Sequence, residues 1–480
     1  MQLSRLLQGV ALTDRIGQEV DVTSLTCDSR TVTPGGLFAA FSGTKEDGSR
    51  FIPEALDRGA AAILCAAPPD GPGPWLVTPE PRRAFGQMAA NWFGRPGDRM
   101  TLVGVTGTNG KTTTTDLLKQ VLERVCRTKV GLIGTNQNLV GSQSFPAQRT
   151  TPDAYQLQEL LARMAAAGCS HVVMEVSSHA LALDRTAGLW FRAGIFTNLT
   201  QDHLDFHGTM DRYRQAKSRL FHQCTTGIFN QDDPVGAALA QTMPCRRVTF
   251  GRREGEVTAR EITFSPAGVS FRAETPQGSA PVQLPIPGAF SVSNGLGVLA
   301  CCLELGLPLA ETAQALSQVT GVRGRMEVVP TPAPFTVVID YAHTPDALSQ
   351  ALTALTPAPG GRRICLFGCG GDRDRTKRAP MGAIAASLAD VVVLTSDNPR
   401  TEDPEQILNQ VAAGFPPGFS AWVRQPDRRA AIRQALALGE PGDVVLLAGK
   451  GHETTQEIGE KRIPLEEREE IASFFQKNTV

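Results

Sequence analysis

Short apolar runs alternate with longer amphipathic stretches over most of this 480-residue chain. The pattern is clearest in the middle of the chain, where "LVGVTG", "KVGLIG", "HVVMEVSS" and "AGIFTNL" have strand length and little polarity. Between them, "KTTTTDLLKQVLERV" and "AYQLQELLARMAAAG" have helical spacing. Nearly continuous apolar strands separated by helices predict a parallel sheet with helices on both faces.

The same alternation returns in the last third of the chain. The apolar runs are "FTVVIDYA", "RRICLFGCGG", "DVVVLTSDNPR" and "DVVLLAGKG", and each ends in glycine or polar residues. Such endings predict a Rossmann-like sheet that places ligands at the carboxyl ends of its strands. Residues 246–286, between the two regions, have a turn-rich β pattern.

The N-terminal region is a third part of the chain. It has the β-like runs "GLFAAF", "AAAILCAA" and "WLV", the helical "FIPEALDRGA", and a closing "WFGRPGDR" that is typical of a linker. A chain of 480 residues is too long for one core. We therefore expect an α/β protein of three domains, at 1–98, 99–322 and 323–480, the central one built on a phosphate-loop sheet.

Composition excludes several classes of protein. The formal net charge of -1 gives no support for binding nucleic acid or an anionic membrane. No apolar run approaches the roughly 20 residues of a membrane helix, and the start lacks the pattern of a signal peptide. The ten cysteines form no CxxC pair, so we expect buried, reduced thiols and no zinc site. These features favour a cytoplasmic enzyme with small-molecule substrates.

The stretch "GVTGTNGKTTTTDLL" contains the strongest chemical signal. Counting back from Gly110, a strict Walker A loop would have its first glycine at Val105, but the glycine is at Gly107. A strand, a glycine-rich turn and a helix still present backbone N–H groups and a helix dipole to phosphates. Lys111 supplies a charge and Thr112 a hydroxyl for Mg²⁺. The alternative, a glycine-rich turn with a surface lysine, is disfavoured by the flanking strand and helix.

Acidic and basic residues further along suit a magnesium nucleotide. Glu175 ends an apolar strand, where a carboxylate is costly unless it is paired or binds a metal; the alternative is a surface glutamate. The stretch "TNLTQDHLDFHGTM" contains Asp202, His203, Asp205 and His207. By themselves they predict a metal cluster, a polar loop or a helix capped by Asp202. Lys217, in "YRQAKSRLF", is by chemistry alone a solvated lysine.

Together these stretches resemble the Mur ligases, the ATP-dependent amide-forming enzymes of peptidoglycan synthesis. The short loop "TGTNGKTT" is typical of that family. It is followed in family order by "MEVSSH", "TNLTQDHLDFHG", "AKSRLF", "GAFSVSN", "GRMEVV", "IDYAHTPDAL", "FGCGGDRDRTKR" and "AGKGHE". The likeness covers essentially the whole chain. "CDSRTVTPGGLFAAFSG" and "SDNPRTEDP" are similar to members that add the third residue of the peptide.

The resemblance implies sites for ATP and Mg²⁺. The residues implied to bind ATP are Gly107, Thr108, Asn109, Gly110, Lys111, Thr112, Thr113, Asn294, Arg325 and Asp340. Thr112 and Glu175 would bind one Mg²⁺, and His203 would contact a second. Lys217 matches a lysine that becomes carbamylated in the family, which turns a cation into an anionic oxygen ligand. The implied catalytic residues are Lys111, Glu175, His203 and Lys217.

The resemblance also implies a site for the muramoyl dipeptide. Its residues would be Ser29, Thr44, Lys45, Glu46, Thr150, Thr151, Ser177 and Arg185. The commoner role of such threonines and serines is in loops and caps. The family often has Asn and Gln where this chain has Arg149 and Leu183. These two departures affect the expected geometry of the dipeptide site and leave the expected reaction unchanged.

A third set of residues forms the expected amino-acid pocket. meso-Diaminopimelate differs from lysine by a distal carboxylate, which the planar fork of an arginine matches. In the family "DNPR" accompanies diaminopimelate, and here it supplies Arg400 after the rigid Pro399. Gly449 and Glu453 would receive the distal ammonium. The full set is Arg373, Asp397, Asn398, Pro399, Arg400, Gly449 and Glu453. The alternative is a helix-capping turn.

The expected reaction follows from this resemblance. ATP would activate the D-glutamate γ-carboxylate of UDP-MurNAc-L-Ala-D-Glu as an acyl phosphate, and the amine of a diamino acid would displace phosphate. The partners would be these small molecules, with no nucleic acid, no membrane insertion and a monomeric chain. The alternatives are lysine or ornithine as the amino acid, a folylpolyglutamate-type or other Mur-type ligase, and a non-catalytic nucleotide-binding regulator. A regulator would be expected to lack Lys111, Glu175, His203 or Lys217.

Overall fold

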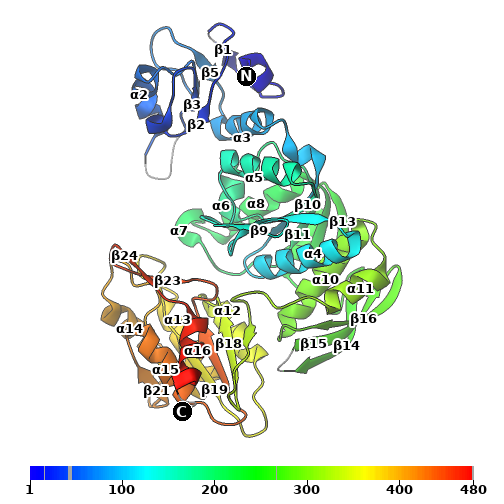
Figure 1. Ribbon diagram of the computed structural model, residues 1–480, viewed down its shortest axis with the longest axis vertical. Coiled ribbons are helices and arrows are strands. Elements are labelled where there is room, and N and C mark those ends of the chain that lie inside the picture. The colour runs from blue at the N-terminus through cyan, green and yellow to red at the C-terminus, as the bar shows by residue number, and fades with distance from the viewer. Residues whose placement is uncertain (16, 42–45, 266–267, 478–480) are drawn as a thin grey trace.

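Three α/β units follow one another along the long axis of the computed structural model (Figure 1). The structure describes residues 1–15, 17–41, 46–265 and 268–477. The N-terminal unit lies at one end, the central unit in the middle, and the C-terminal unit at the other end. No helix in these described ranges is long and apolar enough to cross a membrane.

The N-terminal unit is a small sheet between helices. The strands, in spatial order, are β1 (Asp14–Arg15), β5 (Trp75–Val77), β4 (Ala62–Cys65), β3 (Leu37–Ala39) and β2 (Leu25–Thr26). The helices are α1 (Leu3–Leu6), α2 (Ile52–Asp57) and α3 (Pro81–Trp92), with short 3₁₀ turns at Ser29–Thr31, Gly48–Phe51 and Pro96–Arg99. Successive strand residues face opposite sides: Leu64 packs with Phe85 and Met88 of α3, while Ile63 packs with Ile52 of α2.

The central unit is built on the predicted parallel sheet. In spatial order its strands are β13 (Arg246–Phe250), β12 (Cys224–Asn230), β11 (Phe191–Phe196), β6 (Thr101–Thr106), β10 (Cys169–Glu175), β7 (Lys129–Ile133), β8 (Asn138–Val140) and β9 (Gln143–Phe145). Only the pairings of β8, with β7 and with β9, are antiparallel in this described sheet. The helices are α4 (Lys111–Cys126), α5 (Ala154–Ala166), α6 (Ser178–Ala182), α7 (Leu204–His207), α8 (Met210–Ser218), α9 (Pro234–Thr242) and α10 (Ala289–Glu304), with a 3₁₀ turn at Arg219–His222.

Both faces of this central sheet are covered, because its strands are apolar on both sides. Val173 of β10 packs in one core with Leu118 of α4. Its neighbour Met174 packs in another core with Leu157 of α5. The period of two along the strand therefore divides one apolar run between two helical layers.

A smaller antiparallel sheet extends the central unit. It consists of β14 (Thr258–Ser265), β15 (Gly268–Thr275) and β16 (Gly278–Leu284), and α11 (Leu309–Ser317) packs beside β16. Phe271 and Leu284 share a core with Leu296 of α10. This is the turn-rich β region predicted from residues 246–286.

The C-terminal unit is the second predicted sheet. In spatial order its strands are β17 (Glu327–Val329), β18 (Thr336–Asp340), β22 (Val444–Ala448), β19 (Arg363–Phe367), β20 (Val391–Leu394) and β21 (Trp422–Arg424), all parallel except β17. The helices are α12 (Pro345–Ala354), α13 (Arg378–Leu388), α14 (Pro404–Ala412), α15 (Arg428–Ala437) and α16 (Glu467–Lys477). A separate hairpin, β23 (Thr455–Ile458) and β24 (Lys461–Pro464), follows β22.

The helices of this unit also divide between two layers. Leu352 of α12 packs in one core with Val338 and Leu446, while Ile432 of α15 packs in another with Val337. The carboxyl ends of β18, β19, β20 and β22 open onto a cavity shared with the central unit. The prediction of ligand-accessible strand ends is confirmed to that extent.

The cysteine prediction is partly wrong. None of the ten is in a disulfide and seven are buried, but Cys27 is exposed and Cys126 and Cys245 are half-buried. Cys27 lies between β2 and the 3₁₀ turn that follows.

Candidate active site

The phosphate loop joins β6 to α4 and depends on two glycines. Val105, where a strict Walker A loop would have glycine, is instead a fully buried strand residue. Gly107 has φ +150°, and a Cβ there would lie 1.8 Å from Thr197 Oγ1. Gly110, the N-cap of α4, has φ +84°, and a Cβ there would lie 2.7 Å from Asn294 Oδ1. The shortened loop is therefore a consequence of close packing against neighbouring segments.

The segment after β11 braces this loop. Thr197 Oγ1 donates to the carbonyl oxygen of Asn109 at 2.6 Å. The Asn109 N–H donates to Asn198 Oδ1 at 2.9 Å, and the Thr108 hydroxyl donates to the carbonyl oxygen of Thr200 at 3.1 Å. These bonds fix the loop before α4, whose N-terminal N–H groups are of the kind that suits an anion.

Two lysines converge on one carbonyl group of the loop. Lys111 Nζ donates to the carbonyl oxygens of Gly107 and Thr108, at 2.9 and 2.8 Å. Lys217 Nζ, from α8, donates to the same Gly107 oxygen at 2.6 Å and lies 4.5 Å from the ring centre of Tyr213. Burial lowers the pKa of Lys111, and burial and the neighbouring Lys111 hold the pKa of Lys217 well below its usual value. Lys217 is 1 % exposed, so the solvated lysine expected from chemistry alone is wrong.

Glu175 is likewise buried, at 1 % exposure, which excludes the surface alternative. Its Oε2 accepts a hydrogen bond from Thr112 Oγ1 at 3.0 Å. The backbone N–H of Thr135 donates to Oε1 at 2.7 Å, and the Thr135 hydroxyl donates to Oε2 at 3.1 Å. The carboxylate therefore lies beside the first turn of α4, where the phosphate loop ends.

The Asp202–His207 stretch does not form a metal cluster. In the part of the chain that the structure describes, no group of three His, Cys, Asp or Glu side chains is placed to hold a metal ion. His207 Nε2 instead lies 2.9 Å from Ser178 Oγ, and Asp202 Oδ1 accepts from the His203 N–H at 2.8 Å. The predicted Asp202 cap is wrong, since α7 has His203 at its N-cap and no side-chain cap. Burial lowers the pKa of His203 to about 4, so its imidazole is neutral at pH 7.

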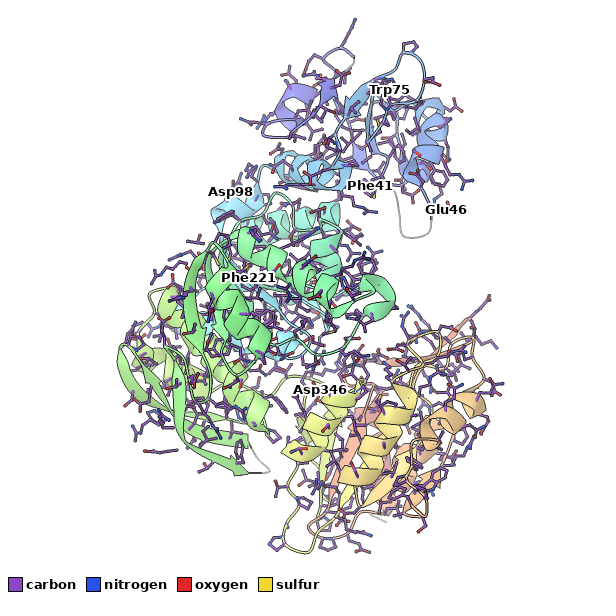
Figure 2. All side chains as sticks on the ribbon, turned by 180° about the vertical axis from the view of Figure 1, so that it is seen from behind. Phe41, Glu46, Trp75, Asp98, Phe221 and Asp346 are labelled. Carbon is purple, nitrogen blue, oxygen red and sulfur yellow. The ribbon has the colours of Figure 1, made fainter. Side chains whose placement is uncertain are left out.

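The C-terminal unit completes the surroundings of the loop. Arg325 Nη2 donates to Thr112 Oγ1 at 3.1 Å, and its guanidinium lies 4.6 Å from the ring centre of Tyr341. Asp340 Oδ2 accepts from the Met326 N–H at 2.7 Å, and burial raises the pKa of Asp340. A direct contact spans the two units, because Asn109 Nδ2 donates to Asp346 Oδ2 at 3.0 Å. Figure 2 labels Asp346 at the side of the C-terminal unit that faces the central one.

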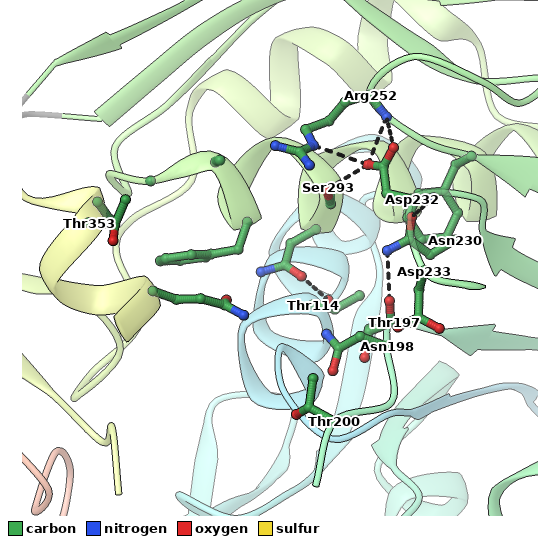
Figure 3. Close-up of a pocket in the computed structure, with 18 of the residues that line it drawn as sticks. Thr114, Thr197, Asn198, Thr200, Asn230, Asp232, Asp233, Arg252, Ser293 and Thr353 are labelled. Carbon is green, nitrogen blue, oxygen red and sulfur yellow. Dashed lines mark hydrogen bonds and ion pairs between the residues drawn. The ribbon is translucent and has the colours of Figure 1, made fainter. Parts of the chain in front are cut away.

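Asn294 of α10 lines two adjoining cavities beside the loop. The smaller, of about 100 Å³, also includes Gly110, Arg325 and Asp340 in its walls. The larger, of about 540 Å³, is shown in Figure 3. Asp232 there accepts hydrogen bonds from the backbone N–H and Nε of Arg252, at 2.9 and 3.1 Å, and Thr353 belongs to the opposite wall.

The predicted amino-acid residues meet in a cavity of about 640 Å³ between the central and C-terminal units. Its walls include Arg373, Asp397, Asn398, Arg400, Gly449 and Glu453, together with His203 from the central unit. Pro399 is not among the lining residues in the described part of the chain. Arg373 is exposed, and a Cβ on Gly449 would lie 2.6 Å from Asp397 Oδ2.

Two charged groups of this cavity, Glu453 and Arg400, already have partners. Glu453 Oε2 accepts from Asn398 Nδ2 at 2.9 Å and from Lys450 Nζ at 2.6 Å. Arg400 Nε donates to Glu457 Oε2 at 2.9 Å. The residue type at each position was predictable, but these partners were not.

The residues predicted for the muramoyl dipeptide fall into two groups. Near the end of β10, Thr151 Oγ1 donates to the Glu175 carbonyl at 2.8 Å and accepts from the Ser177 N–H at 3.0 Å. Arg185 Nη1 donates to the Thr151 carbonyl at 3.0 Å, and Thr150 Oγ1 accepts from the Thr135 hydroxyl at 3.0 Å. Ser177 is also the N-cap of α6, as the cap alternative predicted.

The second group belongs to the N-terminal unit. Ser29 Oγ donates to Glu54 Oε2 at 2.7 Å, and Glu46 is exposed and labelled in Figure 2. Thr44 and Lys45 lie outside the described residues. Of the two departures from the family pattern, Arg149 is exposed and Leu183 is the C-cap of α6.

Sequence reasoning missed several residues of the site. Tyr341, His343 and Lys377 line the 640 Å³ cavity, and Lys377 Nζ donates to the His343 carbonyl at 2.8 Å. They belong to the quoted stretches "IDYAHTPDAL" and "DRDRTKR", which were the available signal. Asp116, one turn after Thr112 on α4, was also missed; burial, and then Glu175, raises its pKa to about 7. Its neighbours one turn away on the helix are polar residues, so the sequence contained no signal for it.

The site combines a phosphate loop, the half-buried Lys111, the buried Lys217, a carboxylate beside the first helical turn and an interdomain cavity. These features define a nucleotide-dependent enzyme. Family models agree: the Mur ligase family catalytic domain matches residues 21–79, the Mur ligase middle domain 105–302, and the Mur ligase glutamate ligase domain 324–451. The chain belongs to the Mur ligase family. It is an ATP-dependent ligase.

Curated relatives support the assignment over nearly the full length. A UDP-N-acetylmuramoyl-L-alanyl-D-glutamate–2,6-diaminopimelate ligase of Alkaliphilus metalliredigens is 44% identical over 96% of this chain and 94% of its own. One from Geobacillus thermodenitrificans is 44% identical over 94% of each. A solved structure of a ligase of that name is 32% identical, with a TM-score of 0.70 and 96% of both chains covered. The ADP complex of MurF from Thermotoga maritima, 18% identical with a TM-score of 0.60 over 95% and 97% of the two chains, shares the fold.

Proposed function

We propose that this protein joins meso-diaminopimelate to the D-glutamate γ-carboxylate of UDP-N-acetylmuramoyl-L-alanyl-D-glutamate, with ATP as the second substrate. The names of the 44%-identical relatives support this substrate pair. The observation that carries the proposal within this chain is the cavity of about 640 Å³. It combines Arg400 and Arg373 with Glu453, a suitable set of charges for the distal zwitterion of diaminopimelate.

The three predicted domains would divide the work. Residues 1–98 would bind the UDP-muramoyl part through Ser29 and Glu46, residues 99–322 would bind ATP, and residues 323–480 would bind the amino acid. Thr150, Thr151, Ser177 and Arg185 would contact the dipeptide beside Glu175. The protein would act as a monomer, and the use of ATP supports the cytoplasm as the place of action.

The chemistry requires an activated acyl group. A γ-phosphoryl group passes from ATP to the D-glutamate carboxylate, which gives ADP and an acyl phosphate. The free amine of the amino acid attacks the acyl carbon, and phosphate leaves from the tetrahedral intermediate. Lys111 and the N–H groups of Gly107–Thr113 would stabilise the phosphates, and Arg325 would add a charge from the C-terminal unit. Asn294 would contact the nucleotide near its base.

Two positions of this chain suit Mg²⁺. Thr112 Oγ1 and Glu175 Oε2 are oxygen donors 3.0 Å apart at the start of α4, and magnesium keeps several waters and phosphate oxygens as further ligands. His203 and a carbamylated Lys217 would hold a second ion. Bound magnesium would neutralise charge on the phosphate oxygens. To bind these ions, Glu175 and the carbamylated Lys217 would have to give up the hydrogen bonds that they make in this structure.

Lys217 has the properties that carbamylation needs. Its amine is buried and its pKa is strongly lowered, so a neutral, nucleophilic form is accessible. The amine would add to carbon dioxide with release of one proton. The product would be an anionic carbamate beside the Lys111 ammonium group, an attractive pair of opposite charges.

The first experiment measures phosphate release from ATP with the UDP-muramoyl dipeptide and, in separate reactions, meso-diaminopimelate, L-lysine or L-ornithine. We expect turnover with meso-diaminopimelate alone. Preference for lysine or ornithine would still support the ligase assignment, but it would show that the "DNPR" motif alone does not determine which amino acid is used. Release with none of them would favour another Mur-type ligase or a binding protein.

A second experiment tests the proposed amino-acid pocket. Arg400→Ala should raise the KM for meso-diaminopimelate more than it lowers kcat. Unchanged kinetics would show that Arg400 does not bind this substrate.

A further inference from the structure

The β23–β24 hairpin fixes the backbone of Arg400. The Arg400 N–H donates to the Glu457 carbonyl at 3.1 Å, and the Gly459 N–H donates to the Arg400 carbonyl at 2.7 Å. Arg400 and Ile458 thereby form an isolated parallel bridge. Arg400 has φ +51°, a left-handed conformation that is uncommon for residues with a side chain. The hairpin therefore stabilises a backbone conformation that the "DNPR" loop would seldom adopt alone.

Glu457 also fixes the side chain of Arg400. Arg400 Nε donates to Glu457 Oε2 at 2.9 Å, and Arg400 Nη1 donates to the Gly371 carbonyl at 2.9 Å. The other carboxylate oxygen of Glu457 accepts from Arg462 Nε at 3.2 Å and lies 3.0 Å from Arg462 Nη2. A guanidinium has about five N–H groups. These contacts occupy two of them and leave the rest for a ligand.

Glu457 lies outside the cavity that Arg400 lines. The 640 Å³ cavity includes Arg400, Gly449 and Glu453 in its walls, while Glu457 is absent from its lining in the described part of the chain. Glu457 and Arg400 have similar side-chain exposure, 27% and 23%, whereas Arg462 is 76% exposed. Glu457 therefore acts on the cavity through Arg400, and Arg462 is a solvent-facing partner that is expected to contribute little.

We propose that Glu457 is a positioning residue that aims Arg400 at the distal carboxylate of the amino-acid substrate and so sets selectivity for an amino acid that has one. The inference rests on the proposed function. A free arginine side chain has many rotamers, and a partner that orders it before binding removes the entropic cost of ordering from the binding step. Glu457 is not required for chemistry at the phosphates, so its effect is confined to recognition.

The test compares three full-length variants with the wild type: Glu457→Ala, Glu457→Gln and Glu460→Ala. Glu460 is an exposed glutamate in the turn of the same hairpin and is the matched control. The measurements are kcat and KM for meso-diaminopimelate, ATP and the UDP-muramoyl dipeptide, together with kcat/KM for L-lysine and the thermal midpoint of each variant.

For Glu457→Ala we expect KM for meso-diaminopimelate to rise about tenfold, the effect of one charge-assisted hydrogen bond. The KM for ATP and for the dipeptide, kcat, and kcat/KM for lysine should change by less than about twofold, within the scatter of surface substitutions. Glu457→Gln keeps an acceptor oxygen, so its KM for meso-diaminopimelate should lie between those of the wild type and Glu457→Ala. Glu460→Ala should have the same kinetic constants as the wild type.

An unchanged or lowered KM for meso-diaminopimelate in Glu457→Ala would overturn the inference. A rise shared equally by all three substrates would also overturn it, because it would indicate general damage to the C-terminal unit. If Glu457→Ala melts early, the isosteric Glu457→Gln decides by the same criteria. Failure of the wild type to use meso-diaminopimelate would refute the proposed function before any variant is compared, so the two failures are distinguishable.

Discussion

Lys217 Nζ donates a 2.6 Å hydrogen bond to the carbonyl oxygen of Gly107, although the two residues are 110 positions apart in the chain. The contact places a buried amine directly against the phosphate loop, next to Lys111. Two cations so close together are unfavourable, and the lowered pKa of Lys217 reflects both its burial and Lys111. Conversion of Lys217 to an anion would remove this repulsion.

We therefore predict that Lys217→Ala lowers kcat by about 10²–10³, the scale seen when one transition-state group is removed. Millimolar formate or acetate should partly restore phosphate release by occupying the place of the carbamate. The matched control is Lys129→Ala, an exposed lysine on β7. A fully active Lys217→Ala enzyme would eliminate the carbamate from the mechanism.

Glu175 should control the magnesium requirement. Glu175→Gln removes the negative charge but keeps one oxygen that can still accept from the Thr135 N–H. Its NH2 group can donate to the Thr112 hydroxyl oxygen in place of the present bond, so folding should be little affected. We expect the Mg²⁺ concentration for half-maximal activity to rise at least about tenfold. A magnesium titration of phosphate release measures this, with Glu159→Gln on the exposed face of α5 as the control. An unaltered titration would remove Glu175 from the metal site.

A fully buried ion pair should stabilise the C-terminal unit. Arg428 and Glu467 are both 0% exposed and 2.8 Å apart. Arg428 also donates to the carbonyl oxygens of Ser396 and Ala448, which connects the ends of β20 and β22. Arg428→Ala should cost about 3–5 kcal/mol, since it leaves Glu467 buried without its partner.

Calorimetry of the full chain should show this cost as a lower melting temperature of the C-terminal unit. The double substitution Arg428→Met, Glu467→Leu should recover much of the loss, because two apolar side chains replace the pair. A double variant no more stable than Arg428→Ala would show that the hydrogen bonds to Ser396 and Ala448 matter more than the pairing.

Acid should destabilise the fold through buried histidines. Burial lowers the pKa of His207 to about 4 and that of His452 to about 3, below the ordinary value of 6.5. Between about pH 6.5 and pH 4 the unfolded chain therefore binds more protons than the folded one, so the free energy of unfolding falls as pH falls.

Urea unfolding at a series of pH values measures this slope. His207→Gln should flatten it by at most about one proton, while Ser178 retains a hydrogen-bonding partner. The control is His222→Gln, an exposed histidine at the end of the 3₁₀ turn after α8. An unchanged slope in His207→Gln would mean that His207 is not the group that titrates.

The sequence by itself determined the secondary structure and much of the membership of the site. Apolar runs predicted β6, β7, β10 and β11 and the second sheet, because a strand buried on both faces has few polar positions. The shortened glycine loop and the ordered motifs indicated the family, since each depends on residues that are neighbours along the chain.

Only the tertiary structure decided how distant residues meet. Local chemistry gave a solvated Lys217, and the fold buries it against Gly107. Arg400 was predictable, whereas its pairing with Glu457 depends on a hairpin that begins 55 positions later. Burial, and the pKa shifts it causes, arise from contacts between elements far apart in the chain, and no local pattern contains them.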